Sequence, residues 1–352
     1  MQDQLRISAV NLANLLFKLM GLVLLLGSLV GGWLVMDYRH TIDSPLPVNA
    51  PGYRLLIPPG ASLRHVTAAM AHDGVLPHPL YLRWLAVLSG RSHAIKAGEY
   101  LLEPGTTPRQ LLDRVVSGAV LEHSLTVVEG WTFAQLMEAL RQQDAIQHTL
   151  DGVIPDQVMA RLGHPGEHPE GRFLPDTYHF PRGTTDLAFL QRAFQAMSGD
   201  LEEEWRAREQ GLPYHSAYEA LIIASIIEKE TALPDERAEI AGVFVRRLVR
   251  GMRLQTDPTV IYGLGARFDG NLTRKDLATN SLYNTYMHAG LPPTPIALPG
   301  MASIHAALHP AAGDALYFVS RGDGSHVFSA TLAEHNRAVR HFQIDPHRVS
   351  AK

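Results

Sequence analysis

The stretch 218–231 restricts most strongly how this chain can fold. Its central part, residues 220–227, is apolar at every position except Ser225 and contains neither glycine nor proline. Such a run is too long for a typical strand and is apolar on almost every side, which is typical of a helix buried in a core. Pro234 follows shortly afterwards and is expected to end it. We therefore expect a domain built around one buried helix.

Two glutamates, Glu228 and Glu230, occupy the C-terminal end of this expected helix. The helix dipole is negative there, so dipole and burial both raise a carboxyl pKa, as a general acid requires. At about 100° per residue the two side chains point to roughly opposite sides. Glu230 continues a face of isoleucines, whereas Glu228 continues the face of Ser225 and suits a polar or structural role. The alternative is that both are solvated ends of an ordinary core helix, paired with Arg246 or Arg247.

Residues 19–36 form an uncharged apolar run near the N-terminus. As a helix this run is about 27 Å long, close to the roughly 30 Å of a bilayer core. No small-residue cleavage site follows it, so we expect a retained transmembrane anchor. Arg6 and Lys18 before the run favour a cytoplasmic N-terminus, residues 1–18. Residues 37–50 are expected to be a tether.

A small domain is expected over residues 51–140. Residues 53–57 predict a strand, Ser62 a helix N-cap after a turn, and residues 97–102 a returning strand beyond two helices. Residues 125–140 open a similar strand–turn–helix unit. Modules of this strand–helix–helix–strand kind resemble LysM domains, which bind glycans. The alternative is a spacer.

The remaining residues, 141–345, predict a larger domain of mixed α+β class. Residues 170–181 are dense in aromatic side chains and turn formers, which suits stacking on sugar rings; the alternative is a loop packed on the core. Residues 186–209 and 237–250 predict amphipathic helices. Residues 315–329 predict a β-hairpin.

The residues that other common functions require are missing from the sequence. The net charge of -4 does not indicate a nucleic-acid binder, and the absence of cysteine excludes thiol chemistry. His305 and His309 have a zinc-site spacing, but no third ligand stands in register, so no metal site is expected. Asp257, directly before a proline, is expected to cap a helix. What remains is a carboxylate at the end of a buried helix, beside polar and aromatic loops. This arrangement suits glycan cleavage by acid catalysis.

Six segments together form a recognisable pattern. They are Ile226-Ile-Glu-Lys-Glu-Thr231, Arg253-Leu-Gln-Thr-Asp-Pro-Thr-Val-Ile-Tyr-Gly263, Tyr283-Asn-Thr-Tyr286, Gly290-Leu-Pro-Pro, His309-Pro-Ala and His335-Asn336. With these segments the chain resembles the YceG-like family over residues 50–342. The resemblance is densest over residues 217–336 and includes the preceding anchor. Leu174 departs from it, because relatives often carry an aromatic residue there.

The resemblance implies a LysM-like subdomain followed by a lysozyme-related catalytic domain without metal or organic cofactor. It implies endolytic cleavage of the β-1,4 bond between N-acetylmuramic acid and N-acetylglucosamine in nascent peptidoglycan, leaving 1,6-anhydro ends and ending strand growth. The family's catalytic glutamate falls on Glu230. The implied location is the bacterial inner membrane, with a single span and a periplasmic catalytic domain. Membrane-bound peptidoglycan synthases are candidate partners.

We expect polar side chains of the same segments to hold the substrate. Two other functions stay open: a hydrolysing muramidase, with Asp257 or Glu228 as second carboxylate, and a non-catalytic peptidoglycan-binding scaffold. The expected substrate-binding residues are Gln255, Asp257, Tyr262, Tyr283, Asn284 and Glu228.

Overall fold

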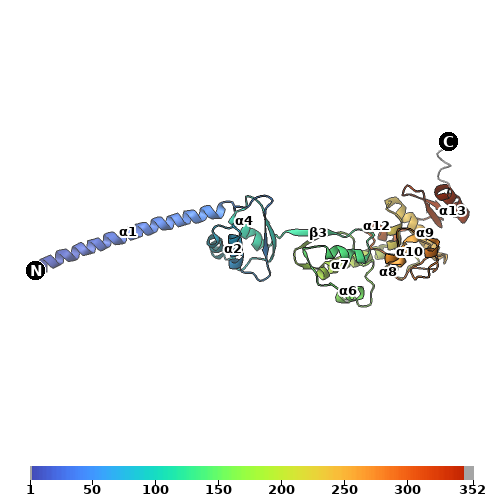
Figure 1. Cartoon of the computed structure of the whole chain (residues 1–352), viewed down its shortest axis with the longest axis horizontal. Coiled ribbons are helices and arrows are strands. Elements are labelled where there is room, and N and C mark those ends of the chain that lie inside the picture. Colours follow the sequence, from blue (N-terminus) through green and yellow to red (C-terminus); the bar gives the residue numbers. More distant parts are fainter. Residues whose placement is uncertain (1, 345–352) are drawn as a thin grey trace, which may run out of the picture. The chain divides into compact units, whose positions relative to one another are not determined.

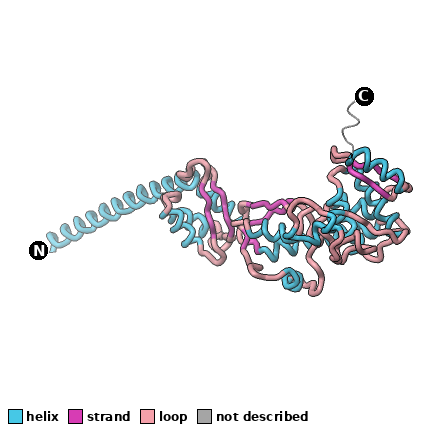
Figure 2. Tube along the Cα trace, turned by 45° about the vertical axis from the view of Figure 1, so that its right-hand side comes forward, coloured by secondary structure: helices cyan, strands magenta, loops and turns pink. Residues whose placement is uncertain are grey.

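The structure is a computed structural model that describes residues 2–344, with only the helical backbone for residues 2–14. The chain divides between Glu122 and His123 into two compact units, which are described separately (Figure 1). Both units combine helices with short two-stranded sheets (Figure 2). The mixed α+β class is therefore confirmed.

The first unit begins with one uninterrupted helix, α1 (Gln2–Asp43). Its part Leu15–Asp43 is long and apolar enough to cross a membrane, judged by length and composition. Ile42 at its end is 1% exposed and lies in the core of the first unit together with Leu46 and Val48. The expected tether, residues 37–50, is thus partly helical and partly packed, because its few apolar side chains are buried.

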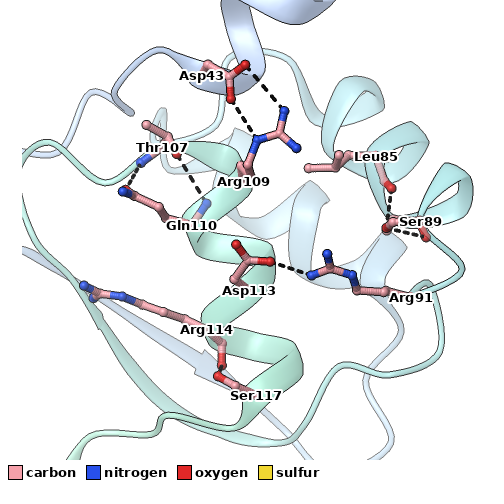
Figure 3. Close-up of polar contacts among 11 residues, drawn as sticks. Asp43, Leu85, Ser89, Arg91, Thr107, Arg109, Gln110, Asp113, Arg114 and Ser117 are labelled. Atoms are coloured by element: carbon pink, nitrogen blue, oxygen red, sulfur yellow. Dashed lines mark hydrogen bonds and ion pairs between the residues drawn. The ribbon is translucent and has the colours of Figure 1, made fainter.

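The rest of the first unit has a strand–helix–helix–strand order, as the sequence predicts. Strands β1 and β2 pair antiparallel, with Tyr53 opposite Leu102. Thr107 caps the last helix by a capping box with Gln110, drawn in Figure 3. The elements are β1 (Tyr53–Ile57), α2 (Leu63–His72), α3 (Pro79–Leu88), β2 (Gly98–Leu102) and α4 (Pro108–Ser117).

The second unit starts earlier in the chain than the expected boundary at residue 141. Leu125 and Phe133 are buried in the same core as Phe173 and Phe189, so residues 123–140 belong to this unit. Strand β3 pairs with β5, and β4 pairs in parallel with β6. The elements are β3 (Glu122–Thr126), α5 (Phe133–Arg141), β4 (Ile146–Gln147), α6 (Pro155–Arg161), β5 (Thr177–Pro181), β6 (Thr184–Thr185) and α7 (Asp186–Ala207).

The aromatic segment 170–181 is not a sugar-stacking surface. Phe173 and Phe180 are 0% exposed and Tyr178 is 7% exposed. Strand β5 alternates, so Tyr178 and Phe180 point inward while His179 points outward. The packed-loop alternative is the correct one.

The expected buried helix is confirmed as α8 (Ala217–Glu230), and residues 220–227 are all buried. It packs against α7, α9, α10 and α12, which gather around it in Figure 1. Neighbours on every side explain why the helix is apolar on every side. The remaining elements are η1 (Pro234–Glu236), α9 (Arg237–Val249), α10 (Asp257–Leu264), η2 (Gly265–Arg267), α11 (Arg274–Leu277), α12 (Met301–Leu308), the hairpin β7 (Tyr317–Ser320) and β8 (His326–Ser329), α13 (Leu332–Val339) and η3 (Arg340–Ile344).

Candidate active site

Glu230, the last residue of α8, lines a polar cleft of about 510 Å³ in the second unit. Three walls surround it: the segment before α10, the hairpin β7–β8, and α13. The polar residues in the lining include Arg247, Gln255, Thr256, Asp257, Tyr286, Tyr317, His326, His335 and Asn336.

The environment of Glu230 favours its protonated form. Burial raises the pKa of the Glu230 carboxyl to about 7, and the negative charge of Asp257 acts in the same direction. The hydroxyl of Thr256 donates a hydrogen bond to Glu230 Oε1 and lowers this pKa, as do the charges of His326 and Arg247. Near neutral pH both protonation states are therefore populated, so Glu230 can give a proton and take one back.

Arg247 places a cation in the cleft without forming an ion pair with α8. Its side chain donates to the carbonyl oxygens of Leu316 at 2.6 Å and Leu254 at 2.7 Å. Arg246 likewise donates to backbone carbonyls. Among the described contacts, neither arginine pairs with a glutamate of α8, so the alternative of an ordinary helix end neutralised by arginine is not observed.

A strained turn aims Thr256 at Glu230. Gln255 has a φ of 52° and is the one non-glycine residue with positive φ in the described part of the chain. Such a backbone costs on the order of 1–3 kcal/mol. The buried Thr285 holds it, since its carbonyl accepts from Gln255 N at 3.2 Å and its hydroxyl from Thr256 N at 3.1 Å. The loop with Tyr283-Asn-Thr-Tyr286 thus positions the residues beside Glu230.

Asp257 is not the helix cap that its position predicts. Thr256 is the N-cap residue of α10, and Asp257 is the first helical residue. Its Oδ1 accepts a hydrogen bond from the hydroxyl of Tyr286 at 2.6 Å. Burial raises the pKa of Tyr286, so this phenol stays protonated and donating. Asp257 is therefore a second carboxylate in the cleft of Glu230.

The two tyrosines expected to bind substrate lie outside the cleft lining. Tyr262 donates its hydroxyl to Glu170 Oε2 at 3.0 Å, and Tyr283 shares a hydrogen bond of 2.8 Å with Thr294. Their rings pack in a T-shaped arrangement, with 4.9 Å between the ring centroids. Glu170 is 3% exposed, and burial raises its pKa to about 7. Both tyrosines are partly buried and pack against the core that contains α8.

Asn284 is also a structural residue of this loop. It is 1% exposed, and its amide nitrogen donates to the carbonyls of Thr279 at 2.7 Å and Leu277 at 3.0 Å. Its side-chain oxygen accepts from Tyr286 N at 2.9 Å. Asn284 thereby fixes the backbone that carries Tyr286 into the cleft.

Glu228 points away from the cleft, toward the start of α12. Its Oε2 accepts from Gly300 N at 3.0 Å and from the Ser303 hydroxyl at 2.7 Å. A carboxylate at the positive end of a helix satisfies N–H groups that lack partners within the helix. This arrangement agrees with the structural role that its helix face predicts.

Several cleft residues are absent from the expected set, namely Tyr286, His326, Tyr317 and His335. His326 pairs with Glu236 at 2.7 Å, and the His335 ring stacks on Tyr317 at 5.2 Å between centroids. Burial lowers the pKa of His335, and its buried Nδ1 has no hydrogen-bond partner among the described residues. Tyr286 and His335 lie in the segments that carry the family resemblance, and their place in those segments is the sequence feature that could have indicated them.

The structure adds a third potential ligand, Glu204, to the histidine pair with zinc spacing. His305 Nδ1 lies 2.9 Å and His309 Nε2 3.9 Å from Glu204 Oε2. The two rings are stacked, however, with 25° between their planes and 4.3 Å between their centroids. Nearly parallel rings direct their in-plane nitrogen lone pairs side by side rather than toward one ion. In this arrangement His305 hydrogen-bonds Glu204, and His309 stacks on the His305 ring.

Comparisons with known proteins agree on one family. The model of the YceG-like family matches residues 55–341. The endolytic murein transglycosylase of Bacillus subtilis is 33% identical over 313 residues, which cover 84% of this chain and 85% of the relative. That of Streptococcus pneumoniae serotype 2 is 28% identical over 88% of this chain and 62% of its own length. A crystal structure of a YceG-like protein from Listeria monocytogenes has a TM-score of 0.52 and 29% identity, and the match covers 82% of this chain and 99% of that one. The chain belongs to the YceG-like family.

Proposed function

We propose that this protein is an endolytic murein transglycosylase that cuts the β-1,4 bond between N-acetylmuramic acid and N-acetylglucosamine within glycan strands. The names of the Bacillus and Streptococcus relatives support this activity. The observation that carries it is Glu230, a carboxyl with a pKa of about 7 in a polar cleft of about 510 Å³.

One carboxyl group performs both proton transfers. Protonated Glu230 first donates its proton to the glycosidic oxygen, which leaves as the 4-hydroxyl of N-acetylglucosamine. The resulting carboxylate then takes the proton of the muramic acid 6-hydroxyl. That oxygen attacks the anomeric carbon and closes a 1,6-anhydro ring. No water is consumed, so the summed products are one water lighter than those of hydrolysis.

Asp257 makes a hydrolysing muramidase the second candidate. Hydrolysis by two carboxyl groups needs a separation of about 5–9.5 Å, and Asp257 lines the same cleft as Glu230. In the transglycosylase mechanism Asp257 has a different task. Its negative charge stabilises the positive charge that develops on the sugar ring and raises the pKa of Glu230.

The expected substrate residues divide into two groups under this proposal. Gln255 and Asp257 contact the sugar directly, since both line the cleft. His335 joins them, since it lines the same cleft. The others act by positioning: Tyr262, Tyr283, Asn284 and Glu228.

The membrane location of the chain, the types of its two units and its partners are part of the same proposal. Helix α1 is the single span of the bacterial inner membrane, with its start in the cytoplasm and the catalytic unit in the periplasm. The β1–α2–α3–β2 order supports a LysM-like first unit, and an acid at the end of a buried helix supports a lysozyme-like second unit. Nascent peptidoglycan is the substrate, and the membrane-bound synthases that make it are the partners.

Digestion of purified sacculi, followed by mass spectrometry of the released muropeptides, tests the activity. The wild-type chain should release anhydro-ended products. Glu230→Gln keeps the shape but cannot donate a proton, so turnover should fall by at least about 10²-fold. Asp257→Asn should slow the reaction while leaving the products anhydro-ended. Reducing-end muramic acid as the main product, or full activity of Glu230→Gln, would contradict the proposal.

A further inference from the structure

Helix α3 is apolar on two faces, only one of which is covered. Leu82 and Leu85 are buried in the core of the first unit. On the other side Leu80 is 56% exposed, Trp84 49%, Val87 64% and Leu88 78%. At about 100° per residue these four side chains share an arc of about 100°, so they form one continuous stripe. Single exposed apolar side chains are common, whereas a stripe of four indicates an interaction surface.

The stripe continues onto α1, within the same unit. A hollow of about 510 Å³ is lined by Trp84, Val87 and Leu88 from α3 and by apolar residues from α1. The α1 residues are Leu34 and Val35, with Tyr38 and Arg39 following them. The exposed face of α3 therefore meets α1 where the uncharged run, residues 19–36, ends.

Specific contacts hold α1 and the body of the first unit together. The Tyr81 hydroxyl of α3 donates to Asp37 Oδ2 at 2.6 Å, and the Tyr81 ring packs on Tyr38 at 5.6 Å between centroids. At the end of α1, Asp43 accepts from Arg109 Nε of α4 at 2.8 Å (Figure 3). Because α1 has no break before Asp43, the stripe stays beside the apolar helix.

We propose that the exposed stripe of α3 lies in the outer interface of the membrane that α1 crosses, buried among lipid headgroups and the first acyl carbons. The position at the end of the apolar run favours lipid over a protein partner. The side chains agree, because Trp84, Tyr38 and Tyr81 are of the amphipathic aromatic kind that is enriched at membrane interfaces. The inference rests on the proposed span. It implies that the first unit lies against the bilayer instead of moving freely on a tether.

The chain contains no cysteine, so a single cysteine introduced at a chosen position can carry a label that tests this placement. The full chain is reconstituted into vesicles of phosphatidylethanolamine and phosphatidylglycerol and labelled with an environment-sensitive fluorophore. The variant sites are Leu88→Cys on the stripe, Leu25→Cys in the span and Glu203→Cys, exposed on α7, as the aqueous control. The fluorescence emission of the labels at positions 88 and 25 should shift to shorter wavelengths. Spin-labelled lipid should quench these two labels several-fold more than the label at position 203. Iodide in the buffer should quench the Glu203 label most.

The outcomes separate this inference from the proposed span. A Leu25 label without lipid quenching shows that α1 does not span, and the inference then fails with it. If the Leu25 label lies in lipid but the Leu88 label is as accessible to iodide as the Glu203 label, α1 spans the membrane and only the inference about the stripe is overturned. A Leu88 label shielded from both quenchers shows protein contact at the stripe, which also overturns it. Glu103→Cys, exposed on the first unit and outside the hollow that the stripe lines, checks that the label itself does not pull the unit into lipid.

Discussion

At the scale of single residues, two neighbours of Glu230 act on its proton in opposite directions. The Thr256 hydroxyl donates to the carboxylate and stabilises its charged form, which lowers the pKa of Glu230. The charge of Asp257 destabilises that form and raises the pKa. Thr256 is 2% exposed, so replacement by valine, which has the same shape, changes the hydroxyl and little else.

These opposed effects predict the pH dependence of the enzyme. In the proposed mechanism the free enzyme needs Glu230 protonated, so kcat/KM should decline above a pH of about 7, roughly tenfold per pH unit. Thr256→Val removes the stabilisation of the carboxylate, and the alkaline limb should move to higher pH. Asp257→Asn removes the repulsion, and the limb should move to lower pH. The measurement is kcat/KM against pH for the three proteins on a soluble glycan. Shifts in the same direction for both variants would contradict the assignment of the limb to Glu230.

The sequence predicts the acid but not its surroundings. Glu230 could be proposed as the acid because the face of a helix follows from spacing along one segment. Tyr286 and Arg247 enter the cleft from other segments, and spacing along the chain does not say which loops meet. Asp257 is expected to be a cap because it stands directly before a proline, yet the helix begins one residue earlier than a cap at Asp257 requires.

At the scale of elements, α8 and α12 are joined through Glu228. The carboxylate accepts from Gly300 N and the Ser303 hydroxyl, so it replaces a side-chain cap that α12 itself lacks. Lost helix caps cost about 0.5–2 kcal/mol. Because Glu228 lies outside the cleft lining, its loss should be felt in folding more than in chemistry.

Substitution of Glu228 should therefore lower stability and spare activity. Glu228→Ala should reduce the free energy of unfolding by about 1–2 kcal/mol, and Glu228→Gln, which keeps an acceptor oxygen, by less. Urea unfolding measures the first effect, and kcat per folded molecule should stay within several-fold of wild type. A kcat loss as large as that of Glu230→Gln would instead place Glu228 in the chemistry.

Element type was predictable wherever composition or capping decided it. The apolar run of α8, the capping residue Ser62 and the hairpin within residues 315–329 all lie where the sequence indicates. The segment 170–181 was ambiguous, since aromatic content alone does not say which side of a strand faces the core. Its burial follows from partners such as Phe189, which lie on another helix.

At the scale of the whole molecule, the division of the chain was misplaced because two units share a similar strand–turn–helix opening. The opening at residues 53–62 belongs to the first unit, and the one at residues 125–133 to the second. Local pattern cannot reveal this difference, because it depends on which core receives the buried side chains. The strand β3 finds its partner in β5, about fifty residues later.

This division predicts which fragments fold. Residues 123–140 contribute five side chains to the core of the second unit, each at most 8% exposed: Leu125, Val127, Phe133, Leu136 and Leu140. At about 1.5–3 kcal/mol for each buried side chain, their loss is comparable with the 5–15 kcal/mol that stabilises a typical domain. Removing Phe133 also deprives the buried Glu170 of the N–H that donates to it at 2.8 Å.

A fragment of residues 123–344 should therefore unfold cooperatively and resist protease, whereas a fragment of residues 141–344 should not. Thermal unfolding and limited proteolysis of both, beside the full chain, measure the difference. The longer fragment should still cleave soluble glycan through Glu230, because all residues that line its cleft are present. On intact sacculi it should be slower than the full chain, since the first unit and the membrane contact are missing. Equal melting temperatures for the two fragments would show that residues 123–140 are not part of this core, and unchanged cleavage of sacculi would reduce the first unit to a spacer.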